Sequence, residues 1–378
     1  MKYLVVSPGY PSETDPYSNA FVHERVKRYI EAGLNVEVYS VSRKLFSPKK
    51  NGASYHYNYI HVEQGNVAEL KQKIRSGQYE KILVHFGFER VVSAAVKAVP
   101  KTPLIIWFHG VDSIGWYRRM YNLQLRNAVK FAGYIPINIL QRFSLRRILV
   151  HHGDRIHCIF VSEWLKQIAE KDMHCVGRIK HASVIPNIVN DETFPYRPKD
   201  PEDRLNILSI RSFASKKYAN DQTVKAIQAL TSKPYFGELT FRICGDGRLW
   251  DSTVKPLKQY PNVHLMRRFF SHDQIVELHS RHGVMLMPSR QDTHGISTCE
   301  GMSSGLVPIT SNNSAIPEYV PAFCGYLTNN YLELADAIED LYNNPHKFLD
   351  LSKKAAEFIR IKCAVPVIVS REIDLISR

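Results

Sequence analysis

The sequence predicts an α/β protein built from two doubly wound domains that face each other across a cleft. Short apolar segments alternate with helical ones along the 378 residues, which is typical of buried parallel strands joined by helices. The alternation restarts after Pro186-Asn187. A chain of this length also suits two cores better than one. We therefore expect a first domain over residues 1–188 and a second over residues 189–362.

In the first half, the apolar residues 3–7 predict a strand, residues 21–32 a helix that Gly33 ends, and residues 35–40 the next strand. Further short strands are expected at residues 82–86, 104–108 and 155–161. In the second half the strands are expected at residues 205–210, 239–244, 264–266, 284–287 and 307–310, with helices at residues 221–230 and 272–279 between them. Ligands of such sheets bind beyond the carboxyl ends of the strands.

Most of the net charge of +14 belongs to the first 188 residues, and the remainder is nearly neutral. A basic half predicts contact with something anionic, such as a nucleic acid, a lipid surface or a charged glycan. The six cysteines form no CxxC pair, so we expect reduced core thiols. The start shows no signal peptide and no stretch is apolar enough to span a bilayer, which favours the cytoplasm.

Cations follow the first strand of the second half. Arg211 comes directly after that strand, and Lys216 and Lys217 precede the next helix. Cations on such a loop can hold a diphosphate through charge-assisted hydrogen bonds. The alternative interpretation is a solvated basic loop.

Glycines follow the next strand, in the sequence Gly245-Asp246-Gly247. Glycine allows a sharp turn and a close approach of the backbone to a ligand. The alternative is a plain turn, because Gly-Asp-Gly is common in turns.

Residues 288–302 combine a polar loop with a helix start. The loop carries Ser289 and Asp292, and a helix beginning near Ile296 would present free N–H groups of Gly295, Ile296 and Ser297 to a phosphate. Glu300 follows eight residues after Asp292, and both carboxylates suit the hydroxyl groups of a sugar or ribose. The alternative for Ser297 and Glu300 is a capping box, S-x-x-E. Residues 314–318 form a further loop after the next strand.

The order of these motifs resembles glycosyltransferase family 4, whose members are retaining enzymes with the GT-B fold of two Rossmann-like domains. The resemblance covers nearly the whole chain. Within the family it is to the members of the bacterial surface-polysaccharide type. Its motifs stand here as Arg211 with Lys216 or Lys217, residues 245–247, Pro288-Ser289, and the acidic pair Asp292 and Glu300. In the first half the matching motifs are Tyr10-Pro11-Ser12, Phe21-Val22 and His109-Gly110-Val111-Asp112, and Pro186-Asn187 with Phe194 matches the interdomain motif.

Four positions depart from the family pattern. Asp292 replaces a glutamate, and Thr293-His294 replaces a Gly-Phe pair. These changes leave the nucleotide motifs intact and put the donor sugar in doubt. Asn19 stands where many members have glycine in the first loop.

The resemblance implies a metal-independent transfer of a sugar from a nucleotide diphosphate sugar, with UDP as the expected carrier, to a glycan or lipid-linked acceptor. It implies that Arg211 and Lys217 neutralise the leaving diphosphate, assisted by Lys216, by residues 245–247, by Ser289 and by the backbone of residues 295–297. Glu300 would bind the ribose, Asp292 a donor-sugar hydroxyl, and His109 would face donor sugar and acceptor. No DxD motif is present to hold a metal, and no other cofactor is expected. The segment from 363 to 378 is expected to cross back to the first domain.

The segment of residues 115–150 predicts contact with an anionic membrane surface. No acidic residue lies between Asp112 and Asp154, whereas cations and aromatic residues alternate. The cations are Arg118, Arg119, Arg126, Lys130, Arg142, Arg146 and Arg147. The alternative is a basic helix packed on its own domain with its arginines in water.

Two rival functions stay open. A nucleotide-sugar epimerase or hydrolase of the same fold would consume the donor without an acceptor. A catalytically dead protein would bind polyanions, nucleic acids among them, in a salt-dependent way. We expect no nucleic-acid partner, because such a protein would have no need of Arg211, Lys217, Gly245 and Glu300 in register.

Overall fold

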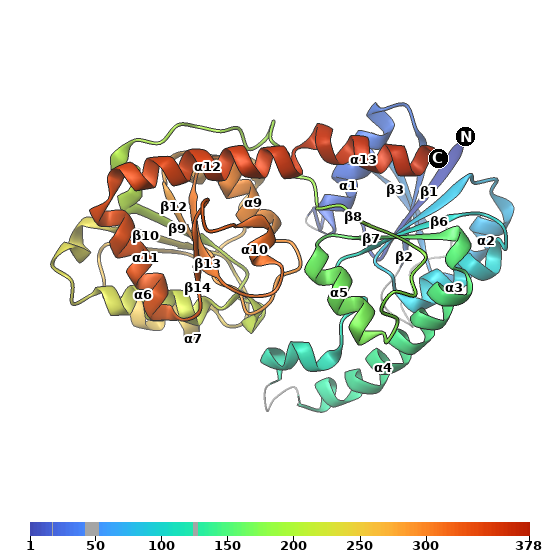
Figure 1. Cartoon of the computed structure of the whole chain (residues 1–378), viewed down its shortest axis with the longest axis horizontal. Coiled ribbons are helices and arrows are strands. Elements are labelled where there is room, and N and C mark those ends of the chain that lie inside the picture. Colours follow the sequence, from blue (N-terminus) through green and yellow to red (C-terminus); the bar gives the residue numbers. More distant parts are fainter. Residues whose placement is uncertain (17, 42–52, 124–127) are drawn as a thin grey trace. The chain divides into compact units, whose positions relative to one another are not determined.

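The computed structural model describes residues 1–16, 18–41, 53–123 and 128–378. They form two compact units, one of residues 1–188 with 368–378 and one of residues 189–367 (Figure 1). Each unit is a doubly wound α/β layer structure with helices on both faces of its sheet. The predicted class, two doubly wound α/β domains, is therefore confirmed.

The first unit contains an eight-stranded sheet in the order β3-β4-β2-β1-β5-β6-β7-β8. All neighbouring strands run parallel except β3 and β4, which form an antiparallel hairpin. The strands are β1 (Lys2–Ser7), β2 (Asn35–Val41), β3 (Ala53–Tyr57), β4 (Ile60–Gly65), β5 (Lys81–His85), β6 (Leu104–Phe108), β7 (Ile156–Phe160) and β8 (His181–Val184). Every residue of β6 is buried, as expected for a central strand covered on both faces.

The helices of this unit are α1 (Ala20–Glu31), α2 (Val67–Ser76), α3 (Glu89–Ala98), α4 (Ala128–His151) and α5 (Glu163–Asp172), with 3₁₀ turns η1 (Trp116–Asn122) and η3 (Gly153–Arg155). Asn19 precedes α1 with a φ of 54°. Glycine adopts this left-handed conformation most readily, and asparagine is among the side chains that tolerate it. The Asn19 amide also donates to the carbonyl oxygens of Pro8 and Gly9, which fixes the first loop.

Helix α13 (Val365–Ser377) begins in the second unit, and its residues from Ile368 onward belong to the first. Its Glu372 accepts hydrogen bonds from Arg25 Nε at 2.9 Å, Tyr29 Oη at 2.7 Å and Trp107 Nε1 at 2.9 Å. The side chains of Arg25 and Glu372 are both fully buried. This ion pair therefore anchors the end of the chain to α1 and β6.

The second unit contains a six-stranded parallel sheet in the order β11-β10-β9-β12-β13-β14. Its strands are β9 (Asn206–Ile210), β10 (Thr240–Cys244), β11 (Val263–Met266), β12 (Val284–Leu286), β13 (Val307–Ser311) and β14 (Tyr326–Thr328). Its helices are α6 (Asn220–Leu230), α7 (Trp250–Val254), α8 (His272–Ser280), α9 (Ile296–Ser303), α10 (Ile316–Tyr319), α11 (Tyr331–Asn343) and α12 (Pro345–Cys363). The 3₁₀ turns are η4 (Pro201–Leu205), η5 (Lys216–Tyr218), η6 (Pro234–Glu238) and η7 (Lys255–Leu257).

The hairpin β3–β4 and the strands β8 and β14 were not expected from the sequence. Alternating burial in β3 and intermediate or exposed positions throughout β8 show why, since neither forms the apolar run that marks a buried strand. Within the described residues, every helix is too short or too polar to cross a bilayer.

Candidate functional site

The predicted site residues of the second unit lie at one edge of its sheet. Arg211 follows β9, the glycine motif follows β10, and Ser289 follows β12. Strands β10, β9 and β12 are neighbours and run parallel, so these three loops meet at the carboxyl edge. The sheet order thus assembles residues that are up to about 80 positions apart in sequence.

Arg211 is held inside this edge and is only 8% exposed. One terminal nitrogen, Nη2, donates to the carbonyl oxygens of Met287 at 3.0 Å and Pro288 at 3.4 Å. Its Nε is buried without a hydrogen-bond partner among the described residues. Leaving such a donor unpaired costs about 1–3 kcal/mol. The alternative of a solvated basic loop is therefore wrong for Arg211, which presents a spare donor in a fixed position.

The two lysines after Arg211 differ in their surroundings. Lys217 Nζ lies 3.7 Å from Asp292 Oδ1, and its side chain is 31% exposed. Lys216 is exposed to solvent. Arg290 fixes the backbone of both, because its N–H donates to the Lys217 carbonyl and its Nη1 to the Lys216 carbonyl. The structure thus brings Lys217, and not Lys216, to the predicted acidic residue.

An aromatic ring that the sequence alone did not assign to the site packs under both cations. The Tyr218 ring centroid lies 5.3 Å from Arg211 Cζ and 5.5 Å from Lys217 Nζ. Such cation–π contacts stabilise a cation by about 0.5–2 kcal/mol. Tyr218 therefore keeps the two cations on one side of the loop.

The glycine motif packs against the Arg211 loop. Gly245 has a φ of +145°, and a Cβ added there would stand 1.8 Å from the Arg211 carbonyl oxygen. Gly247, at +146°, would place a Cβ 2.3 Å from the Ala214 nitrogen. Asp246 between them pairs with Arg267 at 2.8 Å. The glycines hence permit contact between two loops, so the alternative of a plain turn is wrong.

Ser289 fastens the same loop from the other side. Its Oγ donates to the carbonyl oxygens of Lys217 at 3.2 Å and Gln291 at 3.1 Å, and its N–H donates to Ser311 Oγ at 3.0 Å. The Ser289 hydroxyl proton is therefore already donated to backbone carbonyl groups of the protein. We assign Ser289 a positioning role that acts through Lys217.

Helix α9 begins at Ile296, with Gly295 as its N-cap and no side chain capping the terminus. Ile296 N–H already donates to the His294 carbonyl at 3.1 Å, whereas Ser297 is exposed in the first turn. Because Ser297 lies inside the helix and not at its cap, the alternative of a Ser297–Glu300 capping box is wrong. The N–H groups of the first turn remain a place where an anion can bind.

Tyr319 joins this helix end to the charged residues. Its hydroxyl lies 2.6 Å from the place where a Cβ on Gly295 would stand, so glycine is needed for their close approach. Burial raises the pKa of Tyr319 well above its usual value, the charge of Asp292 adds to the shift, and that of Arg211 opposes it. Arg211, Asp292 and Gly295 therefore all lie near Tyr319, a residue that belongs to none of the sequence motifs.

The two acidic residues have different environments. Asp292 is 6% exposed and faces Lys217, and its Oδ1 accepts the Thr293 N–H at 2.9 Å. The Glu300 carboxylate accepts no hydrogen bond from a described residue, whereas its backbone carbonyl accepts the N–H of Ser304 at 3.1 Å. It lines a cavity of about 30 Å³ with Ser297 and mainly apolar residues, namely Leu208, Ile210, Ile275, His279, Met285 and Met287. Burial raises the pKa of Glu300 to about 7, so both of its protonation states are populated near neutrality.

His109 belongs to the first unit and follows β6. Asp112 organises its loop by accepting N–H groups from Gly87 at 2.8 Å, Gly110 at 2.8 Å and His109 at 3.3 Å. The His109 ring packs against Phe86 and Phe21, with centroid distances of 4.5 and 4.8 Å. The motif His109-Gly110-Val111-Asp112 is thus a rigid turn with a buried carboxylate at its centre.

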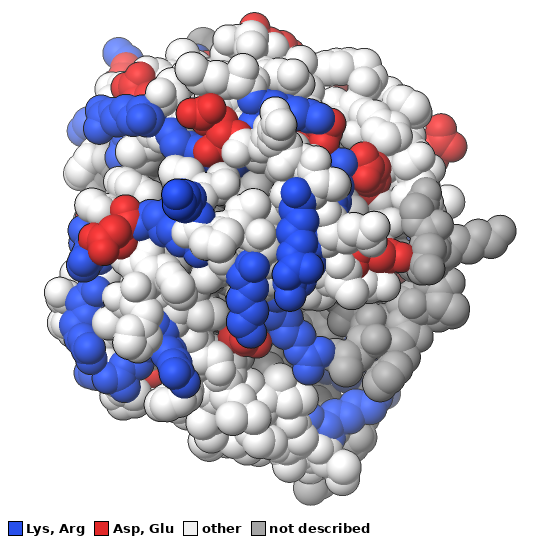
Figure 2. Space-filling model, turned by 90° about the vertical axis from the view of Figure 1, so that its right-hand side faces the viewer, with Lys and Arg blue, Asp and Glu red and all other residues white. Residues whose placement is uncertain are grey.

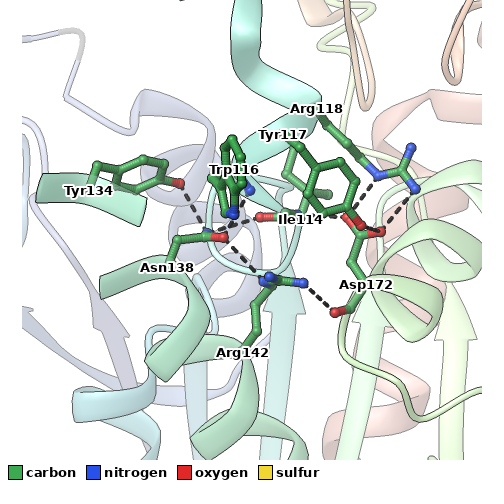
Figure 3. A network of polar contacts seen from close by, with 9 residues as sticks. Ile114, Trp116, Tyr117, Arg118, Tyr134, Asn138, Arg142 and Asp172 are labelled. Atoms are coloured by element: carbon green, nitrogen blue, oxygen red, sulfur yellow. Dashed lines mark hydrogen bonds and ion pairs between the residues drawn. The ribbon is translucent and has the colours of Figure 1, made fainter. Parts of the chain in front are cut away.

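Some residues of the basic segment have hydrogen-bond partners inside the protein. Arg118 and Tyr117 both bind the carboxylate of Asp172, and Arg142 donates to the Asp172 carbonyl and to Asn138 Oδ1 (Figure 3). The expectation that Arg118 and Arg142 face a membrane is therefore wrong, because protein acceptors occupy them. Arg126 lies outside the described residues.

The comparisons with known proteins agree with this geometry. Residues 190–358 match the family model described as glycosyl transferases group 1. No curated protein matches the chain in sequence. Among the described residues, no group of three His, Cys, Asp or Glu side chains could hold a metal ion.

Solved structures that resemble the chain over its whole length have low sequence identity. Sucrose-phosphate synthase from Thermosynechococcus elongatus matches with a TM-score of 0.74 and 15% identity, covering 100% of this chain and 98% of that one. HepE from Anabaena in complex with UDP matches with 0.72 and 15%, covering 100% of each chain. The trehalose-6-phosphate synthase OtsA matches with 0.74 and 11%, covering 100% and 99%. These similarities show that the chain has the GT-B fold.

Proposed function

We propose that the chain is a retaining, metal-independent glycosyltransferase. It takes a sugar from a nucleotide diphosphate sugar, with UDP as the carrier, and transfers it to a glycan or lipid-linked acceptor in the synthesis of a cell-surface polysaccharide. The family match covers the unit that carries Arg211, Lys217 and Glu300. HepE, one of the similar structures, is a complex with UDP. The proposed setting is the cytoplasm, at the inner face of its membrane.

The observation that carries the proposal is the spare hydrogen-bond donor of Arg211. Its buried Nε lacks a partner among the described residues, and Tyr218 holds it beside Lys217. A diphosphate would supply the missing acceptor. When the bond to the sugar breaks, negative charge grows on the leaving phosphate, and fixed donors stabilise that charge more than that of the ground state. Losing one such donor typically costs about 3–4 kcal/mol of transition-state stabilisation.

The other predicted residues receive matching roles. N–H groups in the first turn of α9 would donate to the same diphosphate, since the N-cap residue, Gly295, has no side chain to accept them. Glu300 would accept the ribose hydroxyls, and Asp292 a hydroxyl of the donor sugar. His109, from the first unit, would act on the acceptor side. Retention would follow from attack on the front face of the sugar, with a leaving phosphate oxygen taking the acceptor proton.

A panel of nucleotide sugars tests the proposal by thermal stabilisation of the protein. A ligand at 100 times its dissociation constant adds about 2.7 kcal/mol to the free energy of unfolding. We expect one class of UDP-sugar to raise the melting temperature. Lys217→Met should remove most of this increase and lower kcat by about 10²–10³. Lys216→Met is the matched control, because its exposed side chain does not reach Asp292, and it should retain both.

The outcomes separate the rivals. Donor consumption that needs no acceptor and yields free sugar or an epimer would favour the epimerase or hydrolase. Salt-sensitive binding to polyanions without any response to activated sugars would favour the dead binding protein. Equal effects of Lys216→Met and Lys217→Met would contradict the assignment of the diphosphate site.

A further inference from the structure

Exposed apolar side chains concentrate on one part of the first unit. Nearly half of the exposed large hydrophobic residues that the structure describes lie between positions 117 and 143. They are Tyr117, Met120, Leu123, Val129, Ile137, Ile139, Leu140 and Phe143. The most exposed are Val129 at 87%, Leu140 at 65%, and Ile137 and Phe143 at 62% each. A concentration of exposed apolar side chains indicates an interaction site.

The helical period sorts the residues of α4 into an inner and an outer side. At about 100° per residue, Val129, Ile137, Leu140 and Phe143 fall within an arc of about 120°, which we call the outer stripe. Asn138, Leu145 and Leu149 fall on the opposite side, and they are 3%, 0% and 1% exposed. The stripe extends about 21 Å along the helix. Apolar residues thus occupy both sides of α4, and only the inner ones are buried.

Polar contacts on the inner side fix this orientation. Asn138 donates to the Ile114 carbonyl at 3.1 Å and accepts the Trp116 N–H at 2.9 Å. Arg142 extends the network to Asp172, and Figure 3 shows these side chains converging between α4, η1 and the end of α5. Rotating α4 to bury its outer stripe would break these bonds. The stripe is therefore exposed because the inner side is anchored.

Cations flank the stripe, and acidic residues are absent from it. By the same helical period Lys130 lies about 80° to one side of its centre and Arg146 about 120° to the other, and Arg147 lies at its end. No acidic residue occurs between Asp112 and Asp154. Figure 2 shows Lys and Arg spread over an adjoining face of the same unit, with fewer Asp and Glu among them. An anionic partner complements this surface, whereas a second copy would bring like charges together.

We infer that the outer stripe of α4 lies in the headgroup region of an anionic lipid bilayer. Apolar side chains of an interfacial helix enter the boundary between headgroups and acyl chains, and flanking cations contact the lipid phosphates. The inference deepens the proposed function, since it places the enzyme where a lipid-linked acceptor resides. Binding to lipid is nevertheless independent of sugar transfer and can be measured separately.

Co-sedimentation of the full chain with vesicles tests the inference. One vesicle type contains phosphatidylcholine alone, and the other contains phosphatidylcholine with about a third phosphatidylglycerol. We expect at least tenfold tighter binding to the anionic vesicles. Leu140→Ser with Phe143→Ser should weaken that binding at least tenfold, and Lys130→Gln with Arg147→Gln should remove the preference for anionic lipid. Phe323→Ser with Ile361→Ser, at exposed apolar positions of the second unit, is the matched control and should bind like the unchanged protein.

A depth measurement distinguishes insertion from adsorption. The emission that Phe143→Trp adds to that of the four native tryptophans should be quenched by lipids with brominated acyl chains. The emission that Phe323→Trp adds should not be quenched. If vesicle binding is absent, or if the Leu140/Phe143 pair instead abolishes self-association in light scattering, the inference is overturned. The nucleotide-sugar melting test on the same variants reports separately on the proposed function. If the protein binds vesicles but no nucleotide sugar raises its melting temperature, the proposed function is contradicted and the membrane inference is retained.

Discussion

Replacing Gly245 by alanine tests whether the loop after β10 holds Arg211 in place. The φ of +145° at Gly245 is one that residues with a side chain rarely adopt, and an added Cβ would overlap the Arg211 carbonyl oxygen at 1.8 Å. Strained backbone costs about 1–3 kcal/mol, and forcing volume into a packed site costs about 1–3 kcal/mol more. We therefore expect Gly245→Ala to lower the free energy of unfolding by about 2–6 kcal/mol.

Urea unfolding followed by circular dichroism measures this change, with two other glycines as controls. Gly177 has a φ of +68° but open space around an added Cβ, so Gly177→Ala should cost only the strain, about 1–2 kcal/mol. Gly237 has neither positive φ nor a neighbour within 4 Å. Its alanine variant should stay within about 0.5 kcal/mol of the unchanged protein.

Comparing Gly245→Ala with Gly177→Ala tests whether the backbone at Gly245 lies close to the Arg211 carbonyl. If Gly245→Ala costs no more than Gly177→Ala, the contact between the two loops does not constrain Arg211 and the reasoning fails. If Gly245→Ala is the more destabilising variant, it should also weaken nucleotide-sugar binding. The carbonyl that the added Cβ displaces belongs to Arg211, the residue whose Nε is the spare donor.

Three further predictions concern buried carboxylates. Burial raises the pKa of Glu300 to about 7, so the folded state holds this proton more tightly than the unfolded chain; the resulting stability is full at acid pH and is lost as pH rises through 7. Glu300→Gln should flatten this part of the pH dependence of the melting temperature. Glu372→Ala should destabilise the first unit by about 3–5 kcal/mol in urea, because it leaves Arg25 buried and unpaired, whereas the exposed Ser370→Ala should not. Asp112→Asn should cost about 1–3 kcal/mol and speed hydrogen exchange at the Gly87 and Gly110 amides, which lose a carboxylate acceptor.

The fold was largely predictable because buried parallel strands are apolar throughout. Strands such as β6 and β9 end within a residue or so of the expected positions. The hairpin β3–β4 escaped prediction because its side chains alternate between polar and apolar and include several aromatic and histidine residues. The short strands β8 and β14 contain only four and three residues. Hydrogen bonds to a neighbouring strand define them more than any apolar run does.

The site residues were predictable by type but not by partner. The sequence places Arg211, Lys217 and the glycines after the ends of strands, and the parallel sheet brings these ends together at one edge. It could not reveal that Met287 and Pro288 occupy one arm of Arg211. Nor could it show that Arg118 binds Asp172, which lies 54 residues later. Charge in a sequence indicates a surface, and only tertiary contacts show which charges already have acceptors.

The pairing of Arg25 with Glu372 spans 347 residues of sequence. A growing polypeptide completes β1 through β8 long before Glu372 has been synthesised, so the nascent first unit carries a buried cation without its counter-charge. Local folding during translation therefore stops short of a finished core there. The second unit can complete its own sheet in the meantime. We therefore expect the first unit to reach its full stability only after α13 has docked.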